Sequence, residues 1–324
     1  MSKKYGMTSY LHKVRRHVGH EKIILVFATA CVLNEEGHLL WQRRADFGWW
    51  GLPGGILEWN ESLPECVVRE VREETGLEVE PKRLIGIYTS PDFDVTYPNG
   101  DLVQQVTLCF QCRVIGGKLV ADKEETLDLA WFPPDRRPST SVWYRAMSDD
   151  LSLDQRMAAF DRGDPGSPMG AEPFFHHIRR RIGEIPLILP VAYAFIRNSD
   201  VGILLSRNGH TNQWGLPAIH MTLGERIDQT LARGLLLESG WMADVVRLIG
   251  VYREDSDPFT KPENEGIRKL SVLFNCRLRD QALHAEAIGA SEYRLFPSDA
   301  LPPLSEFHLL LLKDGLADHE DAVF

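Results

Sequence analysis

The sequence predicts two α/β (or α+β) domains related by internal duplication. With 324 residues, 44% of them hydrophobic and 25% charged, the chain suits one large or two ordinary globular domains. Trp50-Gly-Leu-Pro53 recurs as Trp214-Gly-Leu-Pro217, and the same offset of 164 residues aligns the chain from about 9–135 with 173–299. Each copy carries strand-like and helix-like patterns in turn. We therefore predict a first domain over residues 1–150, a linker over 151–172 and a second domain over 173–324.

Strands are predicted on both sides of a central helix in each domain. In the first copy, Val26–Leu33 and Leu39–Arg43 are apolar runs that flank the turn-forming Asn34–Gly37. Further along, Arg83–Tyr88 and Val103–Val114 have the same character, and the loop between them is rich in proline and Asn-Gly.

Two short helices are predicted to close the domains. Leu151–Phe160 is the expected closing helix of the first domain, and Ser305–Leu312 is its expected counterpart in the second. Between the copies, Gly163–Gly170 is dominated by glycine and proline, which is typical of a linker.

The central helix of the first domain is predicted over Leu63–Thr75. Ser62 is a good N-cap, and Glu65 three residues later completes a capping box. Pro64 is tolerated in the first turn because its missing N–H would have no partner there. Gly76 fits a left-handed C-cap, so the helix has about three to four turns.

An acidic motif covers this helix and the loop before it. It reads Gly55-x5-Glu61-x7-Arg69-Glu70-Val71-x-Glu73-Glu74-x-Gly76-Leu77. At about 100° per residue, Glu70, Glu73 and Glu74 share an arc of roughly 100° on the helix. Three negative charges on one arc repel one another unless cations compensate. An acidic, solvated face is the alternative, but the other matched positions of the motif favour a divalent metal site.

This motif resembles the Nudix box, the signature of enzymes that hydrolyse a nucleoside diphosphate linked to another group. The resemblance implies an α/β/α sandwich with a mixed sheet in each domain. It also implies Mg²⁺ or Mn²⁺ as cofactor, with Glu73 and Glu74 as ligands and Glu70 as ligand or base. The carbonyl of Gly54 is a further ligand in many relatives, and so is a carboxylate outside the box, for which Glu124 or Glu125 is the candidate; a solvated charge run is the alternative. Gly55, Glu61, Arg69 and Gly76 are expected to be structural, with Glu61 and Arg69 as an ion pair.

Residues near the box are candidates for substrate binding. Arg43 and Arg44 end a strand that leads to the box, and either guanidinium can hold a phosphate. Arg43 recurs as Arg207 whereas Arg44 becomes Asn208, which makes Arg44 the better candidate. The aromatic candidates for stacking on a base are Trp49, Phe93, Tyr97 and Trp131, for which a place in the core or at the rim is the alternative.

The second copy of the box has lost its acidic cluster. At the offset of 164, Gly55 becomes Ile219, Glu70 becomes Gly234 and Glu73 becomes Leu237. The retained positions are Glu225, Arg233, Glu238 and Gly240. One carboxylate cannot supply the oxygen ligands that Mg²⁺ requires. The second domain is therefore expected to keep the fold without hydrolase activity, as the partner in a pseudo-dimer within one chain. A homodimer of the whole chain and a nucleotide-sensing role for the second domain are the alternatives.

Net charge and composition limit the kinds of partner and the cellular compartment that are expected. The net charge of −10 argues against nucleic acid as a partner. The resemblance to the Nudix box implies a small nucleoside diphosphate derivative as substrate. No apolar run approaches the ~20 residues of a membrane helix, and no signal peptide is apparent, so a cytoplasmic protein is expected. Five cysteines fit a reducing compartment, and Cys109-x-x-Cys112 is assigned to a strand in the core rather than to zinc or redox chemistry.

Overall fold

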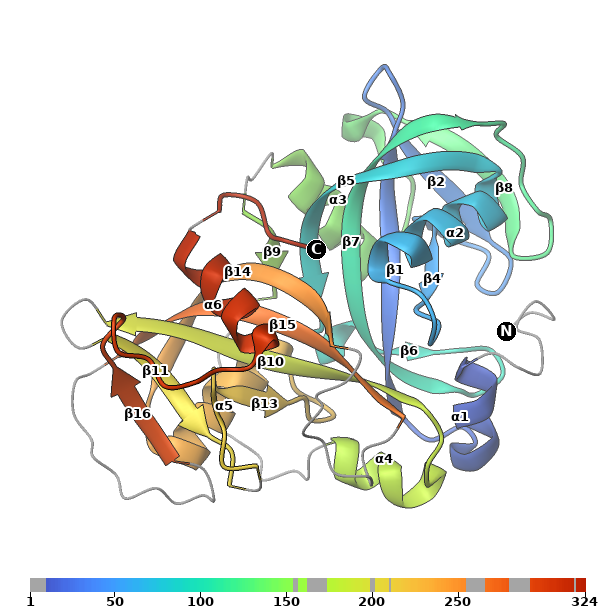
Figure 1. The fold of residues 1–324 in the computed structure, drawn as a ribbon. Helices are drawn as coiled ribbons and strands as arrows, with labels where there is room; N and C mark the ends of the chain where they lie inside the picture. The colour runs from blue at the N-terminus through green and yellow to red at the C-terminus, as the bar shows by residue number, and fades with distance from the viewer. Residues whose placement is uncertain are drawn as a thin grey trace. The chain divides into compact units, whose positions relative to one another are not determined.

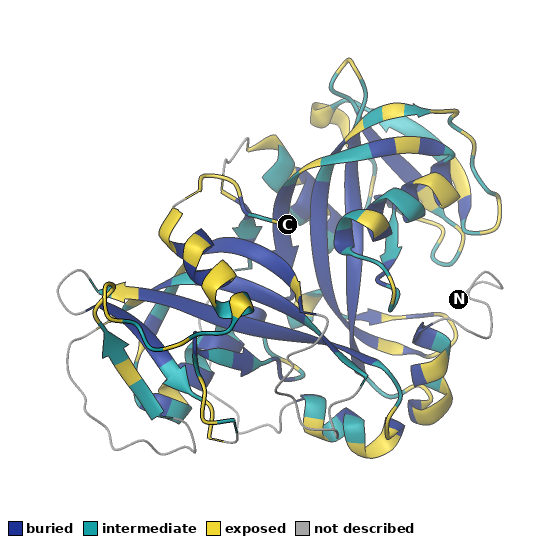
Figure 2. Cartoon of the chain, in the orientation of Figure 1, coloured by how far each residue is buried: buried dark blue, intermediate teal, exposed yellow. Residues whose placement is uncertain are grey.

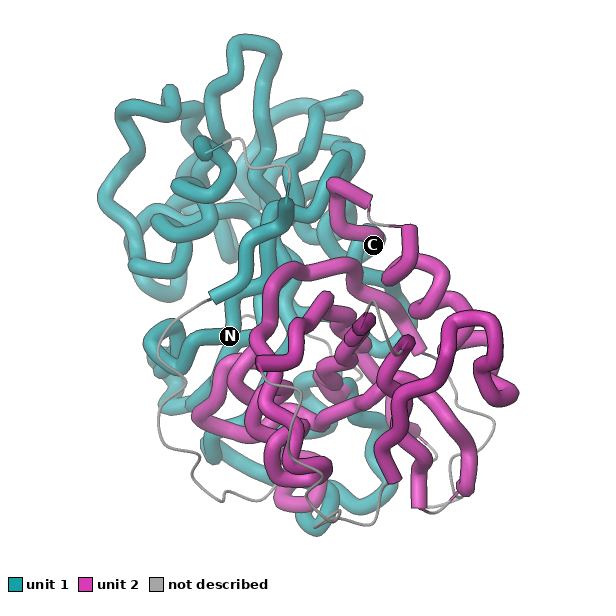
Figure 3. Tube along the Cα trace, turned by 90° about the vertical axis from the view of Figure 1, so that its left-hand side faces the viewer, with its two compact units in different colours: residues 1–161, 178–188, 324 teal, residues 162–177, 189–323 magenta. Residues whose placement is uncertain are grey.

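The computed structural model describes residues 10–153, 157–161, 174–198, 202–209, 211–254, 266–279, 292–317 and 319–324. The chain divides into two compact units (Figure 3). Unit 1 comprises Met1–Asp161, Ile178–Ile188 and Phe324, and unit 2 comprises Arg162–His177 and Leu189–Val323. The Gly- and Pro-rich segment 163–170 lies outside the described residues, and the domain boundaries proposed above stay a prediction.

Unit 1 contains most of its elements in the order that the sequence predicts. They are α1 (Tyr10–Val18), β1 (Ile23–Leu33), β2 (Leu39–Arg44), β3 (Trp50–Gly51), β4 (Gly54–Ile56), α2 (Leu63–Thr75), β5 (Leu77–Tyr88), the 3₁₀ turn η1 (Pro91–Phe93), β6 (Val95–Thr96), β7 (Leu102–Gly117), β8 (Thr126–Phe132), η2 (Pro134–Arg136), α3 (Val142–Ser152) and β9 (Ala159–Phe160).

The sheet of unit 1 is mixed, as expected. Its main path is β3-β2-β1-β7-β5-β9, and β4, β6 and β8 pair with β1, β7 and β2. β1 and β7 are parallel, whereas β5 and β7 are antiparallel. Helices α2 and α3 cover opposite faces of this sheet (Figure 1), so its central strands are buried on both sides (Figure 2). Cys109 and Cys112 on β7 are both buried, which confirms that they belong to the core.

Helix α2 begins and ends at the predicted residues. The Ser62 hydroxyl accepts a hydrogen bond from the Glu65 N–H, and the Glu65 carboxylate accepts one from the Ser62 N–H at 2.7 Å. Gly76 has φ = 72° and donates its N–H to the Arg72 carbonyl at 3.0 Å. Strand β5 begins at the next residue, so the cap turns the chain directly from the helix into the sheet.

The prediction of a closing helix over 151–160 was wrong. The helix is α3, Val142–Ser152, and Ala159–Phe160 form strand β9 beside β5. The spacing of the apolar residues after 150 fits a helix and a short strand equally, so it misplaced the helix. The residues that pack α3 against the core, Tyr144 and Met147, lie before 150. The prediction for the second copy was close, since α6 spans Glu306–Ala317.

The second copy repeats this order. Its elements are α4 (Phe174–Ile182), β10 (Leu187–Asn198), β11 (Gly202–Arg207), β12 (Trp214–Gly215), β13 (Ala218–His220), α5 (Ile227–Ser239), β14 (Ala243–Glu254), β15 (Ile267–Leu278), β16 (Glu292–Phe296) and α6. The main path of its sheet is β12-β11-β10-β15-β14, with β13 on β10 and β16 on β11.

The duplication extends into the closing helices. The Tyr88 hydroxyl donates to Asp150 on α3 at 2.7 Å, and the Tyr252 hydroxyl donates to Asp314 on α6 at 2.8 Å. Both pairs obey the offset of 164, which therefore holds beyond the range visible in the sequence. None of the helices in the described parts of the chain is long and apolar enough to cross a membrane.

Replacing Gly76 by alanine tests how much the C-cap of α2 contributes. A Cβ at Gly76 would lie 2.4 Å from the Lys118 carbonyl oxygen, in addition to the strain of φ = 72°. Gly19 is a matched control, because its φ is 58° and nothing lies within 4 Å of its Cβ position. We expect Gly76→Ala to lower the free energy of unfolding by at least about 1 kcal/mol more than Gly19→Ala, measured by urea denaturation. Equal losses would mean that the contact with residue 118 relaxes freely.

Candidate active site

Two carboxylates of the acidic motif are buried against the sheet. Glu70 and Glu74 are 3% and 4% exposed. Both lie on the inner face of α2 because a spacing of four residues is about one helical turn. Glu73 lies on the outer side and is 38% exposed at its side chain. The three carboxylates therefore do not point into one space: two face inward and one faces solvent.

Glu74 is held by hydrogen bonds from two elements. Its Oε2 accepts the Gly54 N–H at 2.9 Å and the Gln42 side-chain amide at 3.0 Å. Gln42 is in turn fixed by the Thr126 hydroxyl, which donates to its Oε1 at 2.7 Å. Burial raises the pKa of Glu74 to about 8, and the nearby charge of Glu70 adds to this, although these hydrogen bonds oppose it.

Glu70 occupies space that a glycine leaves open. A Cβ at Gly55 would lie 2.3 Å from Glu70 Oε1, so any larger residue on β4 would displace this carboxylate. Arg69 Nη1 donates to the same oxygen at 2.7 Å. Burial nevertheless raises the pKa of Glu70 to about 7, with Glu73 and Glu125 acting in the same direction.

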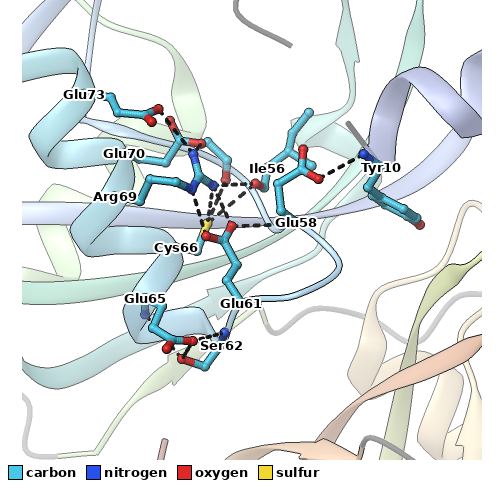
Figure 4. A network of polar contacts seen from close by, with 11 residues as sticks. Tyr10, Ile56, Glu58, Glu61, Ser62, Glu65, Cys66, Arg69, Glu70 and Glu73 are labelled. Carbon is cyan, nitrogen blue, oxygen red and sulfur yellow. Dashed lines mark hydrogen bonds and ion pairs between the residues drawn. The ribbon is translucent and has the colours of Figure 1, made fainter. Parts of the chain in front are cut away.

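An ion pair fixes the loop between β4 and α2 (Figure 4). Arg69 donates to both oxygens of Glu61, from Nε at 2.8 Å and from Nη2 at 2.5 Å, and also to the Ile56 carbonyl at 3.2 Å. Burial alone would raise the pKa of Glu61, but the hydrogen bonds from Arg69 bring it below its ordinary value. The expected ion pair of Glu61 and Arg69 is therefore present. Arg69 also lies 3.5 Å from Glu73, so it links the box loop to the outer carboxylate.

A cavity of about 290 Å³ opens above Glu70 and Glu74. Eight of the residues singled out from the sequence line it, namely Arg44, Gly54, Gly55, Glu70, Glu74, Tyr97, Glu124 and Glu125. Five other candidates for catalysis or substrate binding do not: Arg43 donates to the Gly48 carbonyl at the surface, Glu73 faces outward, and Trp49, Phe93 and Trp131 are not among the lining residues.

The three carboxylates in the loop before β8 have different surroundings: one holds the loop together and two line the cavity. Asp122 Oδ1 accepts the N–H groups of residues 124, 125 and 126 at 2.9–3.1 Å, so this side chain organises the loop. Glu124 and Glu125 follow it and line the cavity.

Several cavity residues escaped the reasoning from sequence, and they surround Arg44. Asp46 accepts two hydrogen bonds from the Arg44 guanidinium, at 2.9 and 2.6 Å, and the Tyr144 hydroxyl accepts a third at 3.3 Å. The ring of Phe47 lies 5.6 Å from that of Tyr97, and Trp143 completes the aromatic part of the wall. Asp46 and Tyr144 become His210 and His308 in the second copy, so the repeat held a signal for this cluster.

The donor chemistry around Glu70 and Glu74 fits a hard divalent cation. Carboxylate oxygens and the Gly54 carbonyl are the ligand types that Mg²⁺ and Mn²⁺ take, and the two buried carboxylates repel each other in the absence of a cation. In the part of the chain that the structure describes, no three acidic, histidine or cysteine side chains are already arranged as a metal site. A metal that used Glu73 would have to draw its carboxylate away from Arg69.

Unit 2 keeps the ion pair but not the buried carboxylates. Arg233 donates to both oxygens of Glu225 at 2.6 and 3.1 Å, in the same geometry as the pair of unit 1. A Cβ at Gly234 would lie 2.4 Å from Ile219, so the isoleucine occupies the space that belongs to Glu70 in unit 1. The remaining carboxylate, Glu238, accepts a hydrogen bond from Tyr293 at 2.7 Å. The space that the Glu70 carboxylate takes in unit 1 is therefore filled by an apolar side chain in unit 2.

The raised pKa values predict a stability that falls as the pH rises in metal-free protein. Glu70 and Glu74 bind a proton more tightly when folded than at their ordinary pKa of 4.5, so their protonated forms favour the folded state. This contribution is complete below about pH 4.5 and is lost as the pH passes through about 7 to 8. We expect the thermal midpoint in EDTA to fall between pH 5 and pH 8 and Glu74→Gln to flatten that fall. An unchanged slope in this variant would remove Glu74 as its cause.

Known proteins resemble both halves of this chain. The family described as "NUDIX domain" matches residues 25–150 and again 188–314. A "MutT-like protein" of Streptomyces ambofaciens is 39% identical over 110 residues, which are 34% of this chain and 64% of that protein. An "ADP-ribose pyrophosphatase" of Methanocaldococcus jannaschii is 46% identical over 74 residues, which are 23% of this chain and 40% of that protein.

Among solved structures, the MutT protein of Methanosarcina mazei Go1 is 29% identical and aligns with 41% of this chain and 96% of its own, with a TM-score of 0.33. This chain covers less than two thirds of the length of the Streptomyces and Methanocaldococcus proteins. The two family matches together cover more than half of the chain, once in each copy and each around one box. The chain therefore belongs to the Nudix family, as a tandem protein with an intact first box and a degenerate second one.

Proposed function

We propose that unit 1 hydrolyses a pyrophosphate bond in a nucleoside diphosphate linked to another group, with Mg²⁺ or Mn²⁺ as cofactor. The observation that carries this proposal is the pair of buried carboxylates, Glu70 and Glu74, at the base of a cavity with Glu124 and Glu125 on its wall. Burying carboxylates that repel each other is costly, and a divalent cation would offset that cost.

Each carboxylate has a proposed role in this site. Glu74 would hold a metal through the oxygen that is free of the Gly54 and Gln42 hydrogen bonds, and Glu73 would add a ligand after leaving Arg69. Glu70 would act as ligand or as proton acceptor from water, a role that its raised pKa suits near neutral pH. The bound metal would neutralise phosphate oxygens and lower the pKa of a water molecule.

Arg44 is the proposed phosphate contact. Asp46 holds its guanidinium through two hydrogen bonds and Tyr144 through a third, which leaves Arg44 pre-organised on the cavity wall. Phe47, Tyr97 and Trp143 would supply ring faces to the base or to the leaving group. Substrates of the ADP-ribose or nucleotide-sugar type, nucleoside triphosphates and RNA 5′ ends are the candidates, and the net charge of −10 disfavours long RNA.

Unit 2 is proposed as the non-catalytic partner of unit 1 in a pseudo-dimer. The support is that unit 2 keeps two polar pairs of unit 1, as Glu225 with Arg233 and Tyr252 with Asp314, while Ile219 fills the space that Glu70 takes in unit 1. A chain that supplies its own second copy needs no further subunit. Light scattering of the full chain should then give the mass of one chain, 36.8 kDa, and a mass twice as large would favour the homodimer.

Replacing Glu73 by glutamine tests whether this residue is a metal ligand. Of Glu70, Glu73 and Glu74, it is the one that faces away from the cavity. We expect turnover of ADP-ribose with Mg²⁺ to fall by about two orders of magnitude or more, because a carboxylate that would hold the metal beside the reacting phosphate is removed. Glu74→Gln and Glu238→Gln are a matched pair at the offset of 164: the first should inactivate the protein and the second should leave kcat unchanged. Full turnover in Glu73→Gln would exclude Glu73 as a ligand.

Asp46→Asn tests the positioning of Arg44. The variant keeps the shape of the side chain but weakens the two charged hydrogen bonds, so the guanidinium is held less firmly. We expect KM for the diphosphate substrate to rise by about tenfold with a smaller change in kcat. A fall in kcat with unchanged KM would instead place Arg44 in the chemical step.

A further inference from the structure

The second copy retains a cavity at the position of the active site. It measures about 610 Å³, against about 290 Å³ in unit 1, and every residue that lines it belongs to unit 2. Val191, Glu238 and His308 line it at the positions of Phe27, Glu74 and Tyr144. A copy that served only as a packing partner would gain stability by filling this space with apolar side chains.

The wall of this cavity has gained a charged network instead. Glu254, 8% exposed, forms an ion pair with Lys269 at 3.2 Å and accepts hydrogen bonds from Tyr193 at 3.1 Å and Ser271 at 3.4 Å. The four residues at these positions of the first copy are uncharged, namely Ser90, Gln105, Thr29 and Thr107. Burying an ion pair where neutral residues suffice costs stability, so this network is better explained by a ligand than by the fold.

A polar atom without a partner also belongs to this cavity. His220 is one of its lining residues, and among the described residues none forms a hydrogen bond with its buried Nδ1. Burial lowers the pKa of His220 to about 4, with Lys269 and His176 acting in the same direction, so the ring is neutral at pH 7. A neutral imidazole can donate or accept one hydrogen bond at this atom. The position is Ile56 in unit 1, so the polar group is new to the second copy.

The charges of the cavity select against phosphate. Among the described residues that line it, none is an arginine, and Asn208 replaces the Arg44 of unit 1. Its carboxylates outnumber its one lysine, and two of them are already engaged, Glu254 by Lys269 and Glu238 by Tyr293. A phosphate group would meet repulsion here without a metal to offset it.

The other walls include aromatic rings and uncharged polar side chains beside a few aliphatic ones. Trp214 and Phe307 line the cavity, and the ring of Tyr193 lies 5.8 Å from that of Phe307. Ser206 and Gln213 also line it and can meet hydroxyl or amide groups. Ring faces combined with dispersed hydrogen-bonding groups suit a molecule with an aromatic base and a sugar.

We propose that unit 2 binds an uncharged nucleoside in this cavity, through ring contacts, the Glu254–Lys269 network and the free Nδ1 of His220. The choice of a nucleoside over another ring-bearing polar molecule rests on the proposed function of unit 1, from whose pocket this one derives by duplication. Binding itself requires neither metal nor turnover.

Calorimetry of the full chain in EDTA tests this proposal. Adenosine, guanosine, cytidine and uridine are titrated separately, together with the diphosphate of each. We expect one or more nucleosides to bind, and each to bind at least about tenfold more tightly than its diphosphate, a difference of about 1.4 kcal/mol. Failure of all four nucleosides to bind at millimolar concentration would overturn the proposal, whatever the hydrolase activity of unit 1 proves to be.

Matched variants locate the site. Glu254→Gln combined with Lys269→Met removes both charges of the network and leaves neither one unpaired; it should weaken nucleoside binding at least about tenfold, that is by about 1.4 kcal/mol. His220→Phe, which keeps a ring of similar size, is the second variant if the first does not fold. Tyr97→Ala, on the cavity of unit 1, should leave the binding unchanged. Loss in Tyr97→Ala, with wild-type binding in the unit 2 variants, would assign the nucleoside to unit 1 and contradict the proposal.

Discussion

The ion pair between Glu61 and Arg69 is the interaction on which the candidate site depends. It fastens the loop after β4 to the middle of α2 with two charged hydrogen bonds, and a third contact holds the Ile56 carbonyl. The loop can then bring Gly54 and Gly55 against the helix face that carries Glu70 and Glu74. The same pair persists in unit 2 as Glu225 and Arg233, where the buried carboxylate beside it is gone. The pair thus accompanies this loop and helix arrangement in both units, with or without the buried carboxylate.

The proposed chemistry uses groups whose burial costs stability. Glu70 and Glu74 are almost completely buried, and this burial raises their pKa values although Arg69 and Arg44 act in the opposite direction. Arg69 reaches Glu70 but is committed to Glu61. A protein that needed only stability would place apolar residues here, as unit 2 does with Ile219.

The helix of the box was predictable because its limits depend on local sequence signals. The other features depend on contacts between distant residues, which the sequence does not display. The capping box at Ser62 and the glycine at 76 act within a few residues, so both ends of α2 followed from the sequence. Strand β5 begins at Leu77, six residues before the predicted start at Arg83. The first half of the strand was missed because bulges beside Pro81 and elsewhere break the alternation of buried and exposed residues. The inward turn of Glu74 and the outward turn of Glu73 depend on where the sheet lies, which helical spacing alone does not state. Asp46 and Tyr144 both form hydrogen bonds with Arg44 although 98 residues of chain separate them, and no local sequence signal joins positions so far apart.

The exchange of glycine between the two boxes also constrains how the second copy could diverge. In unit 1 a glycine on the strand faces Glu70 on the helix, and in unit 2 Ile219 on the strand faces a glycine on the helix. Starting from the arrangement of unit 1, an isoleucine acquired first would have collided with the glutamate, whereas loss of the glutamate first would have left only a void. From that starting arrangement, the route without a collision removes the carboxylate first. Once the isoleucine followed, regaining the glutamate alone became sterically forbidden. The two positions are therefore epistatic, and the proposed loss of metal chemistry in the second copy could not be reversed by one substitution.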